Sequence, residues 1–77
     1  MNRQQAIQKA TATGVLRVNN WVYQRIKIIS FGHEENVWEQ KKLSSISEAK
    51  RFTRNHCKAN HCICVALNKR ERLPKLN

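Results

Sequence analysis

The chain has 77 residues, of which 40% are hydrophobic, and its 15 Lys and Arg residues against 5 acidic residues give a formal net charge of +10. This length excludes a second domain and permits one thin core, because small domains bury only about 60% of their unfolded surface. No apolar run approaches the roughly 18–20 residues that cross a bilayer, and the first residues lack the apolar stretch of a signal peptide, so we expect a cytoplasmic protein with no membrane partner.

The first predicted elements are a short helix and three strands. Residues 2–10 favour a helix, because Asn2 can cap it and small apolar residues recur along one side. Asn19 and Asn20 fit a tight hairpin turn, whereas residues 31–36 suit a longer, solvated turn. Segments rich in β-branched and aromatic residues flank these turns and predict antiparallel strands at 15–18, 21–30 and 37–43.

The main helix follows these strands. Ser45 and Glu48 form a capping-box pattern that starts a helix at Ile46, and Asn60 ends it. Residues at helical spacing divide it into an apolar inner side and a cationic outer side. The inner side holds Ile46, Ala49, Phe52 and His56, and the outer side holds Lys50, Arg51, Arg54 and Lys58.

A last short strand over residues 62–67 is predicted from alternating apolar residues, and a basic tail over 69–77 follows, in which Pro74 discourages regular structure. The sequence therefore predicts an α+β domain over residues 1–68. Its three-stranded antiparallel sheet packs on one main helix, with a short N-terminal helix and a short C-terminal strand added.

The excess of cations indicates a polyanionic partner, nucleic acid, because an unrelieved charge of this size destabilises the compact state. The alternative explanation of the excess charge is a surface that only keeps the protein in solution. One side of the second predicted strand interleaves aromatic and basic residues, which can pack on bases and displace counterions from phosphates. The predicted binding residues on this strand and the next are Trp21, Tyr23, Arg25, Lys27, Trp38, Lys41 and Lys42.

Two structural explanations compete with this binding face. Trp21 and Tyr23 can instead complete a core with the first helix, since large aromatic side chains in small domains usually serve packing. Lys41 and Lys42 can instead protect an exposed strand edge against aggregation. Both explanations remain open from the sequence.

The stretches "GVLRV", "WVYQRI", "VW" and "LSSISEAKRF", in this order, resemble the DNA-binding domain of plant ethylene-response-factor (apetala-two type) proteins. Related domains occur in phage homing endonucleases and at the amino end of many tyrosine integrases. The resemblance covers about residues 14–58. It implies that the sheet lies in the major groove of DNA with the helix packed behind it. It also implies that Arg17, Arg25, Lys27 and Trp38 contact the DNA.

Histidine and cysteine crowd one short stretch near the end of the main helix, in His56, Cys57, His61, Cys62 and Cys64. A structural zinc site draws two ligand pairs from separate segments, and here the second pair is missing, so we expect no metal and no cofactor. Three close cysteines also make a poor disulfide framework. The sequence therefore predicts reduced thiols, with Cys62 and Cys64 packed on one side of the last strand.

Catalysis has little support. His33 with Glu34 and Glu35, or Cys57 beside a histidine, could be imagined as reacting groups, but no third group that would orient them is evident. The sequence predicts no enzyme.

The function predicted from the sequence is nucleic-acid binding, with duplex DNA favoured over RNA, in a transcription or recombination accessory protein of phage or mobile-element type. Two alternatives stay open. One is a small basic protein that binds and inhibits a host nuclease or defence complex, and the other is an RNA-binding module.

Overall fold

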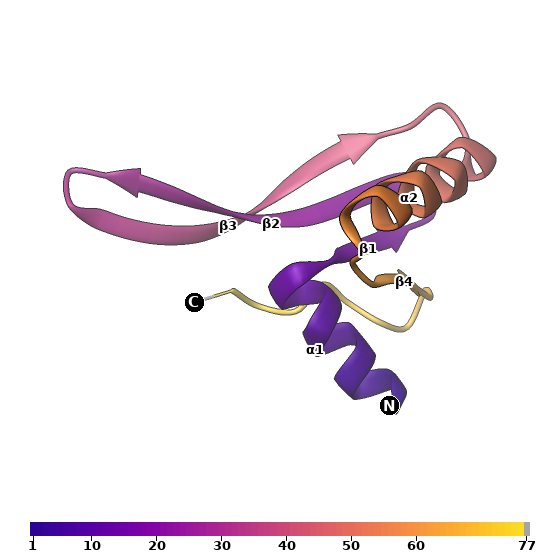
Figure 1. The fold of residues 1–77 in the computed structure, drawn as a ribbon, viewed down its shortest axis with the longest axis horizontal. Helices are drawn as coiled ribbons and strands as arrows, with labels where there is room; N and C mark the ends of the chain where they lie inside the picture. The colour runs from indigo at the N-terminus through magenta and orange to yellow at the C-terminus, as the bar shows by residue number, and fades with distance from the viewer. Residues whose placement is uncertain (77) are drawn as a thin grey trace.

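The computed structural model describes residues 1–76 and contains two helices and four strands within them (Figure 1). The last residue of the predicted basic tail lies outside the described residues. The elements in chain order are α1 (Arg3–Thr13), β1 (Val15–Val18), β2 (Trp21–Ser30), β3 (His33–Lys42), α2 (Ile46–Asn60) and β4 (Cys64–Leu67). No helix in residues 1–76 is long and apolar enough to span a membrane.

The four strands form one mixed sheet in the order β3-β2-β1-β4. The α+β class is confirmed, and β1, β2 and β3 are antiparallel as predicted. The sheet has four strands and not three, because the C-terminal strand, β4, joins it parallel to β1. β2 pairs with one edge of β1 and leaves the other edge for β4. The crossover through α2 brings the chain back in the direction of β1, so the new pairing is parallel.

The predicted turn over residues 31–36 is also wrong, because the chain reverses within two residues. Phe31 and Gly32 both have positive φ, 49° and 79°, and Ser30 pairs directly with His33. A two-residue turn of this kind matches the twist of the flanking strands and lets both continue without a break. The result is a hairpin of two ten-residue strands that projects beyond the helices (Figure 1).

The two helices cover opposite faces of the sheet, and β1 lies between them. Leu16, with none of its surface exposed, packs under α1, whereas Val15, 1% exposed, packs under α2. Successive side chains of a strand point to opposite faces, so one strand supplies both layers of core. The α1 layer also contains Val65 and Leu67 of β4.

α2 begins at Ile46, as predicted, and its cap is confirmed, since the Glu48 backbone N–H donates to Ser45 Oγ at 3.1 Å. The Glu48 side chain accepts instead from the Ser44 hydroxyl, and this hydrogen bond holds the pKa of Glu48 below its ordinary value. The prediction that Ile46 faces inward is wrong. It is 46% exposed, whereas Ala49 is 0% exposed and is the first residue of α2 in the core.

α1 is capped by Asn2, whose side chain accepts from the Gln5 backbone, and the helix runs three residues further than predicted, to Thr13. It is also joined to the C-terminal segment. Arg3 donates to both carboxylate oxygens of Glu71, at 2.6 and 2.8 Å, and to the carbonyl of Ala66. This fork ties the start of the chain to the segment after β4.

The pair of Arg3 and Glu71 makes stability depend on pH. The hydrogen bond from Arg3 lowers the pKa of Glu71 from 4.5 to about 2. A carboxylate with a lowered pKa stabilises the fold above its unfolded value, and that contribution is lost as pH falls through the folded value. We expect Glu71→Gln to lower the Tm at pH 7, and the difference from the unaltered chain to disappear between pH 4.5 and about 2. Thermal melts across that range measure it, and a difference that stays constant with pH contradicts the pairing.

Candidate nucleic-acid interface

The predicted binding face is on the side of the sheet that α1 covers. Pairing with β3 puts Trp38 opposite Arg25, on the same side as Tyr23. Tyr23 and Trp38 are half-buried and pack against the core under α1, and the Trp38 indole N–H donates to the carbonyl of Pro74 at 3.1 Å. Tyr23 therefore serves packing, which is one of the two explanations that the sequence left open. Trp38 is held by its hydrogen bond to the C-terminal segment.

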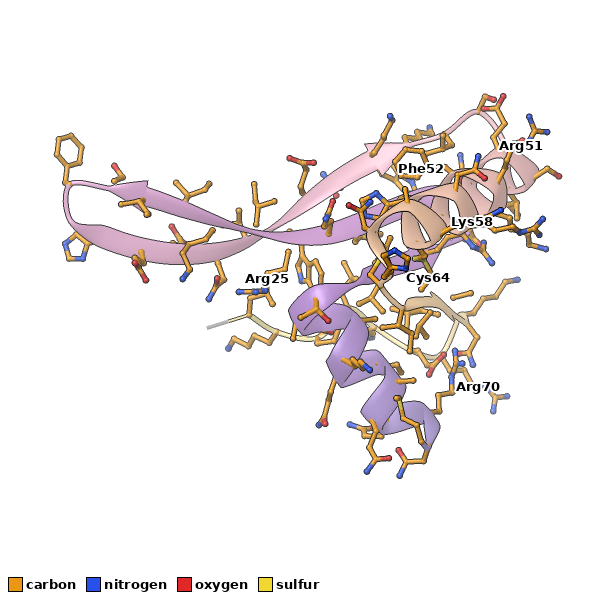
Figure 2. All side chains as sticks on the ribbon, viewed as in Figure 1. Arg25, Arg51, Phe52, Lys58, Cys64 and Arg70 are labelled. Carbon is orange, nitrogen blue, oxygen red and sulfur yellow. A yellow bond between two sulfur atoms is a disulfide. The ribbon has the colours of Figure 1, made fainter. Side chains whose placement is uncertain are left out.

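Arg25 joins the sheet to α1. Its guanidinium donates to the carbonyl of Ala12 at 2.9 Å and to Asn36 Oδ1 at 2.9 Å. Figure 2 shows Arg25 beside the C-terminal end of α1, where the hairpin leaves the body of the domain. Two guanidinium nitrogens of Arg25 serve these hydrogen bonds, and Nε is buried with no hydrogen-bond partner in the described structure, so Arg25 is poorly placed to contact a phosphate as well.

The remaining cations of this face lie along the hairpin. Lys27 Nζ is 3.5 Å from a Glu34 carboxylate oxygen. Lys42 Nζ lies 5.7 Å from the centre of the Trp21 ring, which is itself stacked on Tyr23. Trp21, Lys27 and Lys42 are therefore the predicted residues of this face that keep contact with solvent.

Two predicted residues, Arg17 and Lys41, lie on the opposite face, under α2. Lys41 Nζ lies over the Phe52 ring, 4.7 Å from its centre. Arg17 follows the alternation of β1 and shares the side of Val15. The structure thus divides the eight predicted residues between two surfaces.

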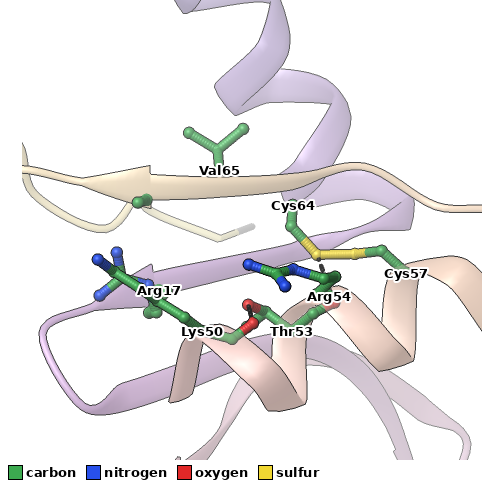
Figure 3. Close-up of a pocket in the computed structure, with 8 residues that line it drawn as sticks. Arg17, Lys50, Thr53, Arg54, Cys57, Cys64 and Val65 are labelled. Atoms are coloured by element: carbon green, nitrogen blue, oxygen red, sulfur yellow. Dashed lines mark hydrogen bonds between the residues drawn. A yellow bond between two sulfur atoms is a disulfide. The ribbon is translucent and has the colours of Figure 1, made fainter. Parts of the chain in front are cut away.

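A groove with a cavity volume of about 350 Å³ lies between α2 and the β1–β4 edge of the sheet (Figure 3). Three cations from two elements reach into it: Arg17 from β1, and Lys50 and Arg54 from α2. We call this cavity, with these three cations in its lining, the cationic groove. Its other lining residues are Thr53, Cys57, Cys64, Val65 and Ala66.

No carboxylate lines the cationic groove, so its positive potential is not neutralised locally. Within residues 1–76 the ion pairs of the structure are elsewhere, between Arg3 and Glu71 and between Lys27 and Glu34. The Arg17 guanidinium donates one hydrogen bond to the carbonyl of Asn19, at 2.7 Å, which fixes its position. A phosphate group is the kind of ligand that such a cluster of cations attracts.

The cations of α2 extend the surface beyond the groove. Arg51 and Lys58 are exposed, and Figure 2 labels both on α2. The sequence had already placed Lys50, Arg51, Arg54 and Lys58 on the outer side of the helix. It gave no sign that Arg17 would join them, because that requires knowing which face of β1 the helix covers.

The prediction of reduced cysteines is wrong, because Cys57 and Cys64 form a disulfide. Their Cα atoms are 6.4 Å apart, so the last turn of α2 and the first residue of β4 come within bonding reach. The Cys62 thiol is free and lies 3.3 Å from the sulfur of Cys57. The spacing of the cysteines along the chain did not indicate this disulfide, because Cys57 and Cys64 come together only when the turn after α2 reverses the chain.

The histidines near this cluster have structural contacts. The His56 ring stacks on Phe52, with ring centres 6.1 Å apart, and the backbone carbonyl of His56 accepts from Asn60 at 2.9 Å. In the described part of the chain, no group of three His, Cys, Asp or Glu side chains is arranged to hold a metal ion.

Comparisons with protein-family models, curated proteins and solved structures found no match for this chain.

Proposed function

We propose that the protein binds nucleic acid, with duplex DNA as the preferred form, by contacts from the cationic groove and the neighbouring cations of α2 to phosphates. The observation that carries the proposal is the convergence of Arg17, Lys50 and Arg54 in a groove that no carboxylate lines. Neutralising phosphates with such cations releases condensed counterions, which supplies most of the affinity of non-specific binding.

The preference for a duplex rests on the positions of the aromatic residues. Single-stranded nucleic acid is bound by stacking bases on exposed rings. Tyr23 and Trp38 are half-buried in the packing between sheet, α1 and the C-terminal segment. The Trp21 ring is stacked on Tyr23 and has Lys42 Nζ near it, so the three rings of this face offer little stacking surface. Contacts to the backbone of a regular helix need no such rings.

The test is a titration of duplex DNA at several salt concentrations with Lys50→Ala and Arg54→Ala variants. Both side chains are exposed, so neither substitution empties the core. Each variant should bind more weakly, and the slope of log affinity against log salt should fall by about one unit for each phosphate contact removed. Single-stranded DNA and RNA of equal length, titrated in parallel, should bind less tightly.

Lys27→Ala is the matched control, since it removes one cation on the hairpin, away from the groove. It should leave the salt slope unchanged. If Lys27→Ala lowers the slope and the two α2 variants do not, the contact surface is the sheet face that the resemblance to the apetala-two type implies.

A second candidate function is binding to a host protein, and the exposed apolar side chains at the hairpin tip favour it. Phe31 is fully exposed, Ile29 is 68% exposed and Ile28 is 45% exposed. Large exposed side chains gathered at one place are typical of protein-binding surfaces. No binding to duplex DNA at moderate salt would leave this candidate in place of the first.

A further inference from the structure

The outer edge of β3 is a long strand edge that pairs with no other strand among residues 1–76, because β3 is the last strand in the order β3-β2-β1-β4. Ser30 and His33 flank the two-residue turn as a hydrogen-bonded pair. Hydrogen-bonded and non-bonded pairs alternate along an antiparallel ladder. Glu34, Trp38, Gln40 and Lys42 of β3 therefore direct their backbone N–H and C=O groups away from β2.

The charges along this edge are arranged with opposite signs at its two ends. Glu34 and Glu35 lie next to the hairpin turn, Lys41 and Lys42 lie at the other end, and Trp38 is midway between Glu34 and Lys42. These four charged residues at the ends of β3 are exposed. A strand with this pattern is complementary to an antiparallel copy of itself.

We propose that β3 pairs with β3 of a second copy of this chain, antiparallel and about a two-fold axis, with Trp38 opposite Trp38. This register places Glu34 opposite Lys42 of the second copy and Glu35 opposite Lys41. Residues directly opposite in a ladder share one face, so opposite charges meet on both faces of the joined sheet. The two-fold axis repeats each pair, and the two sheets continue into one.

Neighbouring registers are disfavoured by the same charges. Moving the axis to Val37 sets Glu35 opposite Glu39 and His33 opposite Lys41. Moving it to Glu39 sets that carboxylate opposite itself. Like charges directly opposite each other destabilise a strand pair. The charges along the edge therefore favour the register with Trp38 on the axis, in which four pairs carry opposite charges, and the lysines oppose indiscriminate pairing, as edge lysines usually do.

The net charge of +10 on each chain opposes association, but it acts over longer distances than the pairs at the edge. At physiological salt, exposed charges further apart than about 8 Å are largely screened. Pairs in contact across a strand ladder are closer than this. A single strand edge is a small interface, below the roughly 1,200 Å² of most stable complexes, so we expect a weak dimer that forms at high protein concentration.

The test is a charge exchange followed by sedimentation equilibrium. One variant carries Glu34→Lys and Glu35→Lys, and the other carries Lys41→Glu and Lys42→Glu. In each variant alone the paired positions have like charges, so self-association should weaken at least tenfold. In a mixture of the two, every pair regains opposite charges, and a heterodimer should form at least as well as the unaltered dimer.

A third variant, Lys69→Glu with Arg70→Glu, changes the net charge as much as the lysine variant does but leaves β3 intact, and it should associate at least as well as the unaltered chain. Recovery in the mixture shows that both β3 variants are folded. A chain that stays monomeric at every concentration overturns the proposal, as does association that the β3 variants leave unchanged or that their mixture does not restore. The proposal does not rest on nucleic-acid binding, and nucleic acid is left out of the measurement.

Discussion

Gly14→Ala is expected to lower the free energy of unfolding by about 3 kcal/mol or more. Gly14 ends α1, and its N–H donates to the carbonyl of Ala10 at 2.9 Å. A Cβ at this position would overlap the backbone carbonyl oxygen of Ile63 and lie 3.0 Å from Cα of Ala10. Both neighbours are backbone, so no side-chain rotation relieves the contact.

The cost is large because the crowded carbonyl also holds the sheet together. Ile63 accepts from the Val15 N–H at 3.0 Å, immediately before β1 and β4 begin to pair. Relief of the overlap would stretch this hydrogen bond and move β4 away from β1. Overpacking usually costs about 1–3 kcal/mol, and we expect at least the upper end of that range, a large part of the stability of a small domain.

Gly32→Ala is the matched control, since it adds the same methyl group at the hairpin tip. Nothing lies within 4 Å of a Cβ there, but φ is +79°. The left-handed conformation costs a non-glycine residue about 1–2 kcal/mol. Urea unfolding of both variants measures the difference, and equal midpoints would show that Gly14 is not held against Ile63.

Removing the disulfide is expected to cost about 2–3 kcal/mol, the second largest effect. The bond closes a short loop, with a sequence separation of 7, and a loop of that size restricts the unfolded chain by about this amount. Cys57→Ala with Cys64→Ala should therefore lower the midpoint of urea unfolding. Reduction of the unaltered chain should lower it by a similar amount.

Cys62→Ala is the control for this prediction, because it removes a cysteine and leaves the bond intact. It should change stability little. Alkylation of the folded, unreduced protein followed by mass spectrometry should modify Cys62 alone. Modification of all three cysteines before reduction would show that the disulfide is absent from the purified protein.

The position of α1 decides how the two sheet faces are used. Its packing on Leu16 and Tyr23 covers part of the face that carries the predicted aromatic and basic residues. The opposite face is covered by α2 only over Val15, Val22 and their neighbours, which leaves the groove beside β4 open. Arg17, Lys50 and Arg54 line this open groove on the α2 side of the sheet.

Local patterns in the sequence determined most of the elements. The capping pattern at Ser45 set the start of α2, Asn19 and Asn20 made the first hairpin turn, with Asn19 at a φ of 54°, and β1 and β2 have their predicted bounds. Each of these features depends on residues within a few positions of one another. The outer side of α2 followed for the same reason, because helical spacing alone separates its cations from Ala49.

Only the tertiary structure decided what lies far apart in the sequence and close in space. The parallel pairing of β4 with β1, the bond between Cys57 and Cys64, and the approach of Arg17 to α2 all depend on the path of the chain after α2. The binding face could not be assigned for the same reason. Alternation along β2 separates two sides equally well whichever helix covers them, so only the packing of α1 and α2 shows which cations face solvent.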